Sequence, residues 1–378
     1  MRRLALAAFL GLLAHAEDFP KGTIIDEVKC AADASQTYAL YLPSNYSPDR
    51  AWSVIFAFDP RARGRAPLEA YQPAAEKYGY IVAGSNNSKN GPWAVSLAAA
   101  QAMLADVGSR FSIDPKRLYA TGLSGGARVS MALALSAGKF AGVIASSAGF
   151  PDSRRRTSLE FVVVATAGTG DFNYLEMRRM DHVLTSPHRL LIFDGGHAWP
   201  PSDVAMQAVE WLEIQAMKSG LRGRDEELLE RIFSARKSQA AGLTNSRDAY
   251  VALTGLASDF EGLRVVREFS ARSEALSRDK EVQKALKDDR AQEQHEELLN
   301  RELAQLAADL DNPATRRDNL EEFRSRLTKL SRQARGPEDS PERQLARRAL
   351  WAVIVDNSSR QDPELHKLLQ EVRPAEHP

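Results

Sequence analysis

The pattern of apolar residues divides the chain into two parts that meet near Gly220. In the first part, short and almost uninterrupted apolar runs alternate with longer stretches in which apolar residues recur every three or four positions. Runs of the first kind are typical of strands buried in a parallel sheet, and stretches of the second kind are typical of helices that cover it. The predicted strands are residues 53–58, 81–84, 118–121, 142–146, 161–165 and 190–193, and the predicted helices are about residues 67–77, 95–110, 124–137, 172–184 and 202–218.

Two earlier segments, residues 23–28 and 37–42, alternate apolar and polar positions and are separated by a polar turn. This pattern predicts an antiparallel pair at the start of the sheet. The repeated strand, helix, strand units that follow imply right-handed crossovers and helices on both faces. We therefore predict an α/β fold with a mostly parallel sheet, in which ligands bind beside the carboxyl ends of the strands.

Beyond Gly220 no strand pattern remains, and charged residues rise from roughly a fifth of the chain to more than a third. The apolar residues Leu303, Leu306 and Leu310 have the spacing of one helix face. Helix starts are predicted where a capping residue precedes proline, at Asn312-Pro313, Ser340-Pro341 and Asp362-Pro363. We expect an all-α C-terminal domain at residues 220–378, either a bundle or a tetratricopeptide-like array, because no repeat of fixed length is evident.

The N-terminus has the composition of a cleavable secretion signal. A basic start at Arg2 and Arg3 precedes the apolar run of residues 4–13 and the sequence Ala14-His15-Ala16, which has the form of a cleavage site. An uncleaved anchor is the alternative, but about ten apolar residues are too few to span a bilayer. We therefore expect a signal peptide at residues 1–16, an α/β domain at residues 17–219, and a periplasmic or secreted protein without a membrane span.

The overall composition narrows the possible functions. Lys and Arg number 50 and balance 50 Asp and Glu residues, so neither nucleic-acid binding nor membrane-surface binding is indicated. The only cysteine is Cys30, which rules out an intramolecular disulfide and a metal cluster built on cysteine. We expect Cys30 to pack as a small apolar group.

The most informative motif is Gly122-Leu123-Ser124-Gly125-Gly126, a G-x-S-x-G sequence between a predicted strand and a predicted helix. In such a nucleophile elbow, a serine on a tight turn projects its Oγ above the sheet, and only glycine-like neighbours fit around it. A serine hydroxyl also needs a base, and the base needs an acid that orients it. Because an isolated match is common in turns, its interpretation depends on those two partners.

Two further residues follow later strands in the order that this chemistry requires. Asp171 lies on a glycine-rich loop directly after one predicted strand, and His197 lies on the loop after the next. Ser, then Asp, then His is the chain order of α/β-hydrolases, whereas chymotrypsin-like and subtilisin-like enzymes use other orders. Asp194 and Asp181 are alternative acids, but Asp171 has the strand-end position that we expect of the acid.

Residues 113–127, the loop at residues 168–171 and the segment Gly195-Gly196-His197-Ala198-Trp199-Pro200 resemble secreted polyhydroxybutyrate depolymerases and feruloyl esterase-type enzymes of the α/β-hydrolase superfamily. The resemblance covers about residues 35–215. It implies an α/β-hydrolase catalytic domain in which Ser124, Asp171 and His197 are the nucleophile, acid and base of a carboxylic ester hydrolase. It also implies a reaction that uses no metal and no organic cofactor.

The sequence departs from this family directly after the strand predicted at residues 53–58. Enzymes of the family usually carry a His-Gly pair there that helps to form the oxyanion hole, whereas this chain reads Asp59-Pro60-Arg61. We expect the backbone N–H of Gly125, directly after the nucleophile, to be one oxyanion donor. Proline has no N–H, so the second donor is expected from Asp59 or Arg61.

The sequence also offers candidates for the walls of a substrate pocket. The connection between the strands at residues 142–146 and 161–165 is too short for a large lid, so we expect an open pocket unless helices beyond Gly220 fold over it. Arg61 is a candidate for binding an acidic substrate group, and pairing with acidic residues of the helical domain is the alternative. Trp199 is a candidate for lining an aromatic acyl pocket, with a packing role as the alternative.

Three functions are compatible with these features. The first is an exported serine esterase that acts through an acyl-enzyme on a small-molecule or polymeric ester. The second is a serine peptidase on the same fold, since a triad does not by itself distinguish an amide from an ester. The third is a non-catalytic hydrolase-like domain whose helical part, residues 220–378, binds a protein partner or forms an oligomer.

Overall fold

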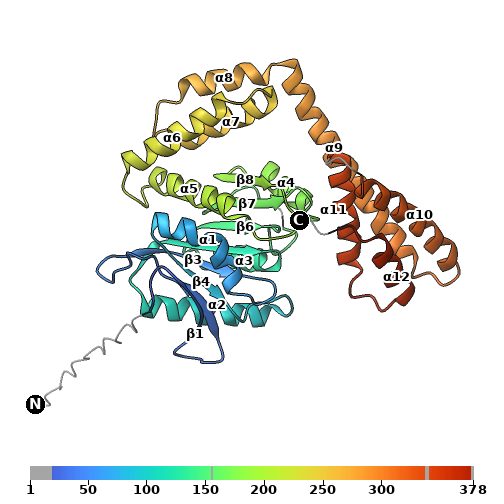
Figure 1. Cartoon of the computed structure of the whole chain (residues 1–378), viewed down its shortest axis with the longest axis horizontal. Coiled ribbons are helices and arrows are strands. Elements are labelled where there is room, and N and C mark those ends of the chain that lie inside the picture. Colours follow the sequence, from blue (N-terminus) through green and yellow to red (C-terminus); the bar gives the residue numbers. More distant parts are fainter. Residues whose placement is uncertain (1–18, 155, 337–339, 376–378) are drawn as a thin grey trace, which may run out of the picture.

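The computed structural model describes residues 19–154, 156–336 and 340–375 (Figure 1). The signal peptide predicted at residues 1–16 lies outside these residues. An eight-stranded sheet occupies the N-terminal half, and only helices and loops follow residue 218 in the described part of the chain. None of the described helices combines the length and the apolar character that crossing a membrane requires.

The sheet has the strand order β1-β2-β4-β3-β5-β6-β7-β8. Its strands are β1 (Ile24–Lys29), β2 (Thr37–Tyr41), β3 (Trp52–Phe58), β4 (Tyr80–Ser85), β5 (Ile113–Leu123), β6 (Phe140–Ser146), β7 (Val162–Gly168) and β8 (His188–Phe193). β2 runs antiparallel to both β1 and β4, and every other neighbouring pair is parallel. This is the sheet of the α/β-hydrolase fold, so the predicted fold class is confirmed.

The third strand shows how the sequence builds a core on each face of the sheet. Val54, Phe56 and Phe58 join one core, and Ile55 joins the other. The first core is covered by α2 (Trp93–Arg110), α3 (Gly125–Ala137) and α4 (Tyr174–Val183), and the second by α1 (Arg65–Tyr78) and α5 (Ser202–Lys218). Cys30 packs in the first core as expected, and burial raises the pKa of its thiol to about 11.

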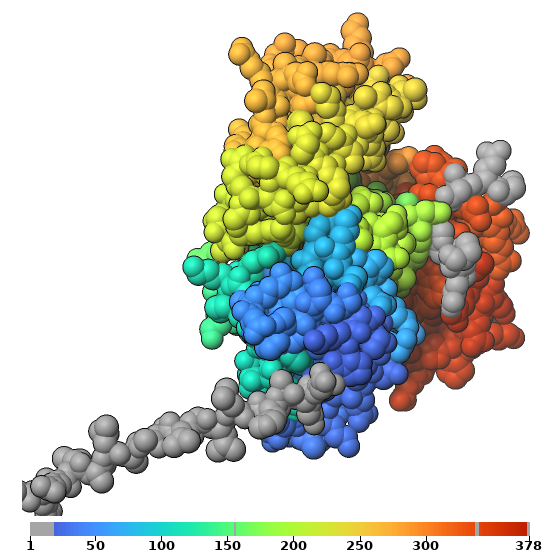
Figure 2. Space-filling model, turned by 60° about the vertical axis from the view of Figure 1, so that its left-hand side comes forward, coloured from blue at the N-terminus to red at the C-terminus, as the bar shows by residue number. Residues whose placement is uncertain are grey.

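The later helices form two groups joined by one long helix (Figure 1). α6 (Glu226–Ala241), α7 (Ser246–Phe260) and α8 (Arg267–Ser277) share a core with the end of α5. α9 (Lys280–Asp309) leads to the second group, where its C-terminal half packs with α10 (Arg316–Ala334), α11 (Pro341–Asp356) and α12 (Pro363–Val372). In Figure 2 the first group stands above the N-terminal part, and the red C-terminal helices lie to the right of the N-terminal part.

Two of the three predicted helix starts are confirmed. The Ser340 hydroxyl caps α11 and the Asp362 carboxylate caps α12, each by accepting a backbone N–H of the first turn. The side chain of Asn312 instead accepts the N–H of Ala314 in a turn, and α10 begins only at Arg316. The proline after Asn312 therefore lies in a turn that precedes the helix.

A buried carboxylate joins the first helix group to the sheet. Asp259 of α7 accepts a hydrogen bond of 2.7 Å from Nε1 of Trp211 in α5, and it pairs with Arg189 of β8 and Arg236 of α6. Burial and the neighbouring charge of Arg236 lower the pKa of Arg189 to about 10. A single carboxylate, that of Asp259, therefore balances the positive charge of two guanidinium groups.

We expect Asp259→Ala to lower the free energy of unfolding by about 3–5 kcal/mol, because it leaves two largely buried cations without their shared anion. Urea denaturation at pH 7, followed by circular dichroism, measures this change. Asp248→Ala on the same helix is the control: Asp248 pairs with Arg247 at the surface, and its loss is expected to change stability by less than about 0.5 kcal/mol. Equal losses in the two variants would contradict the anchoring role of Asp259.

Candidate active site

Ser124 lies at the junction of β5 and α3 in a strained backbone conformation. Its φ is +54° and its ψ is −120°, a region that costs a residue with a side chain about 1–3 kcal/mol. A Cβ at Gly122 would lie 2.1 Å from the carbonyl oxygen of Gly126, and a Cβ at Gly126 would lie 1.9 Å from that of Phe58. Both positions therefore require glycine, and the turn has the geometry of a nucleophile elbow.

Asp171 and His197 form a hydrogen-bonded pair at the same edge of the sheet. Asp171 is completely buried, and its Oδ1 lies 2.8 Å from Nδ1 of His197. A carboxylate accepts, so Nδ1 carries the proton and Nε2 is left as an acceptor. The imidazole also stacks on Phe172 with 4.0 Å between ring centroids, which fixes its plane. The pair thus presents a histidine nitrogen that is able to take a proton.

The loops that carry this pair are joined backbone to backbone. Thr169 N–H donates to the carbonyl oxygen of Phe193, and Gly170 N–H donates to that of Gly195 at 2.8 Å. A Cβ at Gly168 would lie 2.3 Å from the same Gly195 oxygen. The acid loop is residues 169–173, and the histidine loop is residues 194–201. The glycines at these loops allow the two backbones to approach closely enough to hold one loop against the other.

The strand order places Ser124 after β5, Asp171 after β7 and His197 after β8, all at the carboxyl edge. Among the hydrogen bonds of the described residues, none joins Ser124 to His197; such contacts often tighten only when substrate binds. The two alternative acids have other partners: Asp194 accepts a bond from the Thr169 hydroxyl, and Asp181 lies against His188. Of the three candidate acids, Asp171 is therefore the one that contacts His197.

Asp59 organises the loop after β3. Its buried carboxylate accepts hydrogen bonds from the backbone N–H of Arg61 at 2.8 Å, from the Arg63 guanidinium and from Nε1 of Trp199 at 2.8 Å. Burial alone would raise the pKa of Asp59, but these hydrogen bonds together lower it. The expectation that the Arg61 N–H is free to act as an oxyanion donor is thereby corrected, because Asp59 already accepts it.

The same contacts place the predicted substrate-binding residues. Trp199 donates a hydrogen bond to Asp59 and packs edge-on against Tyr71. It therefore has the packing role that was expected as the alternative to lining an acyl pocket. Neither Trp199 nor Arg61 lines the cleft into which Ser124 opens. The N–H groups of Gly125 and Asp59 remain the predicted oxyanion donors.

Asn90 is a residue near the site that sequence reasoning missed. Its Oδ1 lies 1.9 Å from the point where a Cβ of Gly125 would stand, and its own N–H donates to the carbonyl oxygen of Pro60. The loop after β4 thus meets both the elbow and the loop after β3. The atom that meets the elbow is the amide oxygen, which accepts and does not donate, so this contact packs the loop against the elbow and adds no oxyanion donor. In the sequence, Asn90 ends a polar cluster, residues 86–90, that reads only as a loop.

Ser124 opens into a cleft of about 830 Å³ whose opposite wall is formed by the helical part of the chain. Phe172 and Leu175 line it on the side of the sheet, and residues of α9 and α11 line it on the other, so helices beyond Gly220 do fold over the site. Its charged residues include two pairs, Arg128 with Glu176 and Arg179 with Glu297. The cleft is therefore partly apolar, and several of its charged side chains are neutralised by ion pairs with one another.

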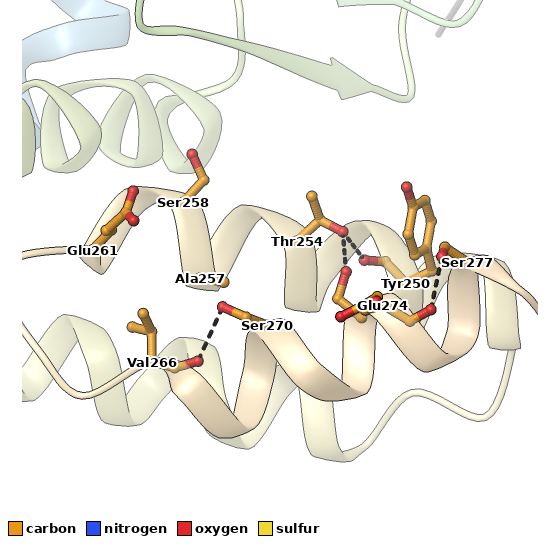
Figure 3. A pocket seen from close by; sticks show the side chains of 10 residues that line it. Tyr250, Thr254, Ala257, Ser258, Glu261, Val266, Ser270, Glu274 and Ser277 are labelled. Carbon is orange, nitrogen blue, oxygen red and sulfur yellow. Dashed lines mark hydrogen bonds between the residues drawn. The ribbon is translucent and has the colours of Figure 1, made fainter.

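A second cavity of about 360 Å³ lies between α7 and α8 and contains none of the predicted site residues (Figure 3). Its wall is rich in hydroxyl groups, and several of these bond to neighbouring groups of α7, α8 and the turn between them. Thr254 bonds to Ser273 and to the carbonyl oxygen of Tyr250, and Ser270 bonds to that of Val266. In the described residues, no group of three or more His, Cys, Asp or Glu side chains is placed to hold a metal ion.

Comparisons with known proteins find no matching family model and no matching curated protein. Solved structures do match. S-formylglutathione hydrolase (FrmB) from Staphylococcus aureus is 14% identical, over 47% of this chain and 90% of that one, with a TM-score of 0.37. Est1E from Butyrivibrio proteoclasticus is 11% identical, over 51% and 98%, with a TM-score of 0.40. Native Est2, an esterase of Thermogutta terrifontis, is 16% identical, over 58% and 99%, with a TM-score of 0.40. Identities this low transfer no activity, so the chemistry must be inferred from the chain's own residues.

We expect Gly122→Ala to slow the reaction of Ser124 with a fluorophosphonate probe by about 100-fold, because its Cβ forces the elbow apart. Mass spectrometry of the labelled peptide follows this reaction. Gly108→Ala in α2 is the matched control: its Cβ would meet only Ile113 at 3.8 Å, so labelling is expected to stay unchanged. Wild-type labelling of the Gly122 variant would show that the close packing of the elbow is not needed.

Proposed function

We propose that the chain is a serine hydrolase of carboxylic esters, with Ser124 as nucleophile, His197 as base and Asp171 as acid. The observation that carries this proposal is a serine with positive φ, enclosed by obligatory glycines, at the sheet edge where a buried carboxylate holds a histidine. Backbone strain of this kind persists only where its surroundings impose it, and it clusters at active sites.

The proposed reaction proceeds through an acyl-enzyme. Ser124 Oγ attacks the ester carbonyl carbon while Nε2 of His197 takes its proton, and the Gly125 N–H donates to the oxyanion that forms. Collapse of this intermediate expels the alcohol, which receives the proton from His197. Water then attacks the acyl-enzyme while His197 takes its proton. As this second intermediate collapses, the carboxylic acid leaves and His197 returns the proton to Ser124 Oγ. Asp171 holds the imidazole and stabilises its charged form.

The cleft favours an uncharged ester that carries an apolar group of moderate size. Phe172 and Leu175 lie on one wall, and Ala304 and Ala308 of α9 lie on the other. Small side chains leave room between the walls, and the paired charges offer little to an ionic substrate. The finer class given by the sequence resemblance, a polyhydroxybutyrate depolymerase-like or feruloyl esterase-like enzyme, and export through residues 1–16 are part of this proposal.

The reaction class is tested with Ser124→Ala on p-nitrophenyl esters and peptide anilides. We expect the wild-type chain to hydrolyse the esters, and the variant to lose about 10⁶-fold in kcat because the nucleophile is gone. Asp171→Asn is expected to lose about 10⁴-fold, because it no longer holds the required tautomer of His197. Turnover of anilides alone would assign a peptidase instead. Absence of any turnover would favour the non-catalytic alternative, in which residues 220–378 bind a partner or form an oligomer.

The role of α9 as a wall of the substrate site is tested by Ala308→Trp, which fills part of the cleft. We expect kcat/KM for p-nitrophenyl octanoate to fall about tenfold, and that for the acetate to stay within about twofold, because only the longer acyl group meets the indole. Gln305→Trp is the control on the same helix, at a position that does not line the cleft. Equal effects on both esters would contradict this assignment.

A further inference from the structure

Arg348 of α11 reaches from the helical part of the chain to the loop that carries Asp171. Its Nη1 donates a hydrogen bond of 2.7 Å to the carbonyl oxygen of Thr169. Its Nε and Nη2 pair with the two carboxylate oxygens of Glu296 in α9, the first at 2.8 Å. The guanidinium also lies 4.5 Å from the ring centroid of Tyr174, the first residue of α4. Both charged side chains are buried.

The contact with Thr169 completes the anchoring of the acid loop. The Thr169 N–H bonds to the last residue of β8 and the Gly170 N–H to the histidine loop, and the Thr169 carbonyl oxygen accepts a bond from Arg348. Asp171 follows two residues later, and Tyr174 N–H donates to its carbonyl oxygen. A shift of this loop would therefore move the carboxylate relative to Nδ1 of His197.

We propose that Arg348, fixed by Glu296, is a positioning residue for Asp171 and, through it, for His197. This inference rests on the proposed function and extends it: the helical part of the chain holds the catalytic acid in place as well as lining the cleft. Outer residues that orient metal ligands commonly change affinity or activity by about 10- to 100-fold when removed, and we expect an effect of that size for a residue that orients the catalytic acid.

The surrounding interface favours this role. Glu293, Glu296 and Glu297 are spaced as one face of α9, and that face meets α4, the helix that begins directly after the acid loop. Glu293 pairs with Arg178 at 2.7 Å and Glu297 pairs with Arg179 at 3.0 Å. A buried ion pair adds little net stability over apolar residues of similar size, whereas its geometry is specific. In this structure, the fixed geometry of the Arg348–Glu296 pair holds the acid loop in one position.

The test uses the full chain with the double substitution Arg348→Met/Glu296→Leu, which removes both charges so that neither is left buried alone. The control is Arg326→Met/Glu302→Leu, a more exposed pair that joins the same α9 to α10 and does not reach the acid loop. Circular dichroism and thermal unfolding establish that both variants are folded. If the first is not, Arg348→Lys replaces it, since a lysine keeps the charge but loses the fork that reaches Glu296 and Thr169 together.

We expect kcat for a p-nitrophenyl ester to fall about 10- to 100-fold in the first variant with KM within about twofold, and both to be unchanged in the control. The hydrogen-bonded Nδ1 proton of His197, observed by proton NMR, is expected to move upfield or to exchange faster in the first variant only. A folded first variant with wild-type kcat and a wild-type Nδ1 signal overturns the proposal. Because the NMR signal needs no turnover, its response in a chain that hydrolyses no ester would retain the positioning role and reject the proposed function.

Discussion

At the carboxyl edge of the sheet, two pairs of backbone segments lie so close together that no side chain fits between the members of each pair. Gly122 and Gly126 meet each other and the end of β3, and Gly168 meets the loop after β8. This packing imposes the positive φ of Ser124 and brings the acid loop within hydrogen-bond distance of the histidine loop. The arrangement of the whole site follows from this contact, because any added Cβ would separate the elements that carry its residues.

Both cores of the sheet lie behind this edge, and two buried charged side chains are among the groups that attach the helical part to the sheet. Asp259 binds the first helix group to β8, and Arg348 binds the second group to the acid loop. The high charge of residues 220–378 is therefore not only a solvated surface: some of it forms the buried contacts between the two parts of the chain. The same helices close one side of the cleft above Ser124.

Much of this could be predicted from local sequence signals. The uninterrupted apolar run at residues 54–58 identifies β3 because every residue of that strand is buried. The glycines around Ser124 identify the elbow because their packing leaves no room for a Cβ. β5 begins at Ile113, before the predicted start at residue 118. The earlier start was not predicted because residues 113–117 are half-exposed or exposed and three of them are charged. The part of a strand that is not buried lacks the continuous apolar run by which strands were predicted here.

Contacts between distant segments could not be predicted in the same way. Nothing in the order of residues relates Arg348 to Thr169, or Asn90 to Gly125, since each pair is brought together only by the complete fold. The engagement of the Arg61 N–H by Asp59 is a local turn, but it depends on a buried carboxylate whose other partner, Trp199, lies far along the chain.

The most direct test of Ser124 as the nucleophile of this site is a crystal structure of the chain after reaction with an alkyl organophosphonate. We expect a covalent bond from phosphorus to Ser124 Oγ and a phosphoryl oxygen within hydrogen-bond distance of the Gly125 N–H. We also expect Nε2 of His197 beside the adduct and the alkyl group in the cleft toward α9. A chain that does not react, or an adduct on a residue other than Ser124, would contradict this assignment of the nucleophile.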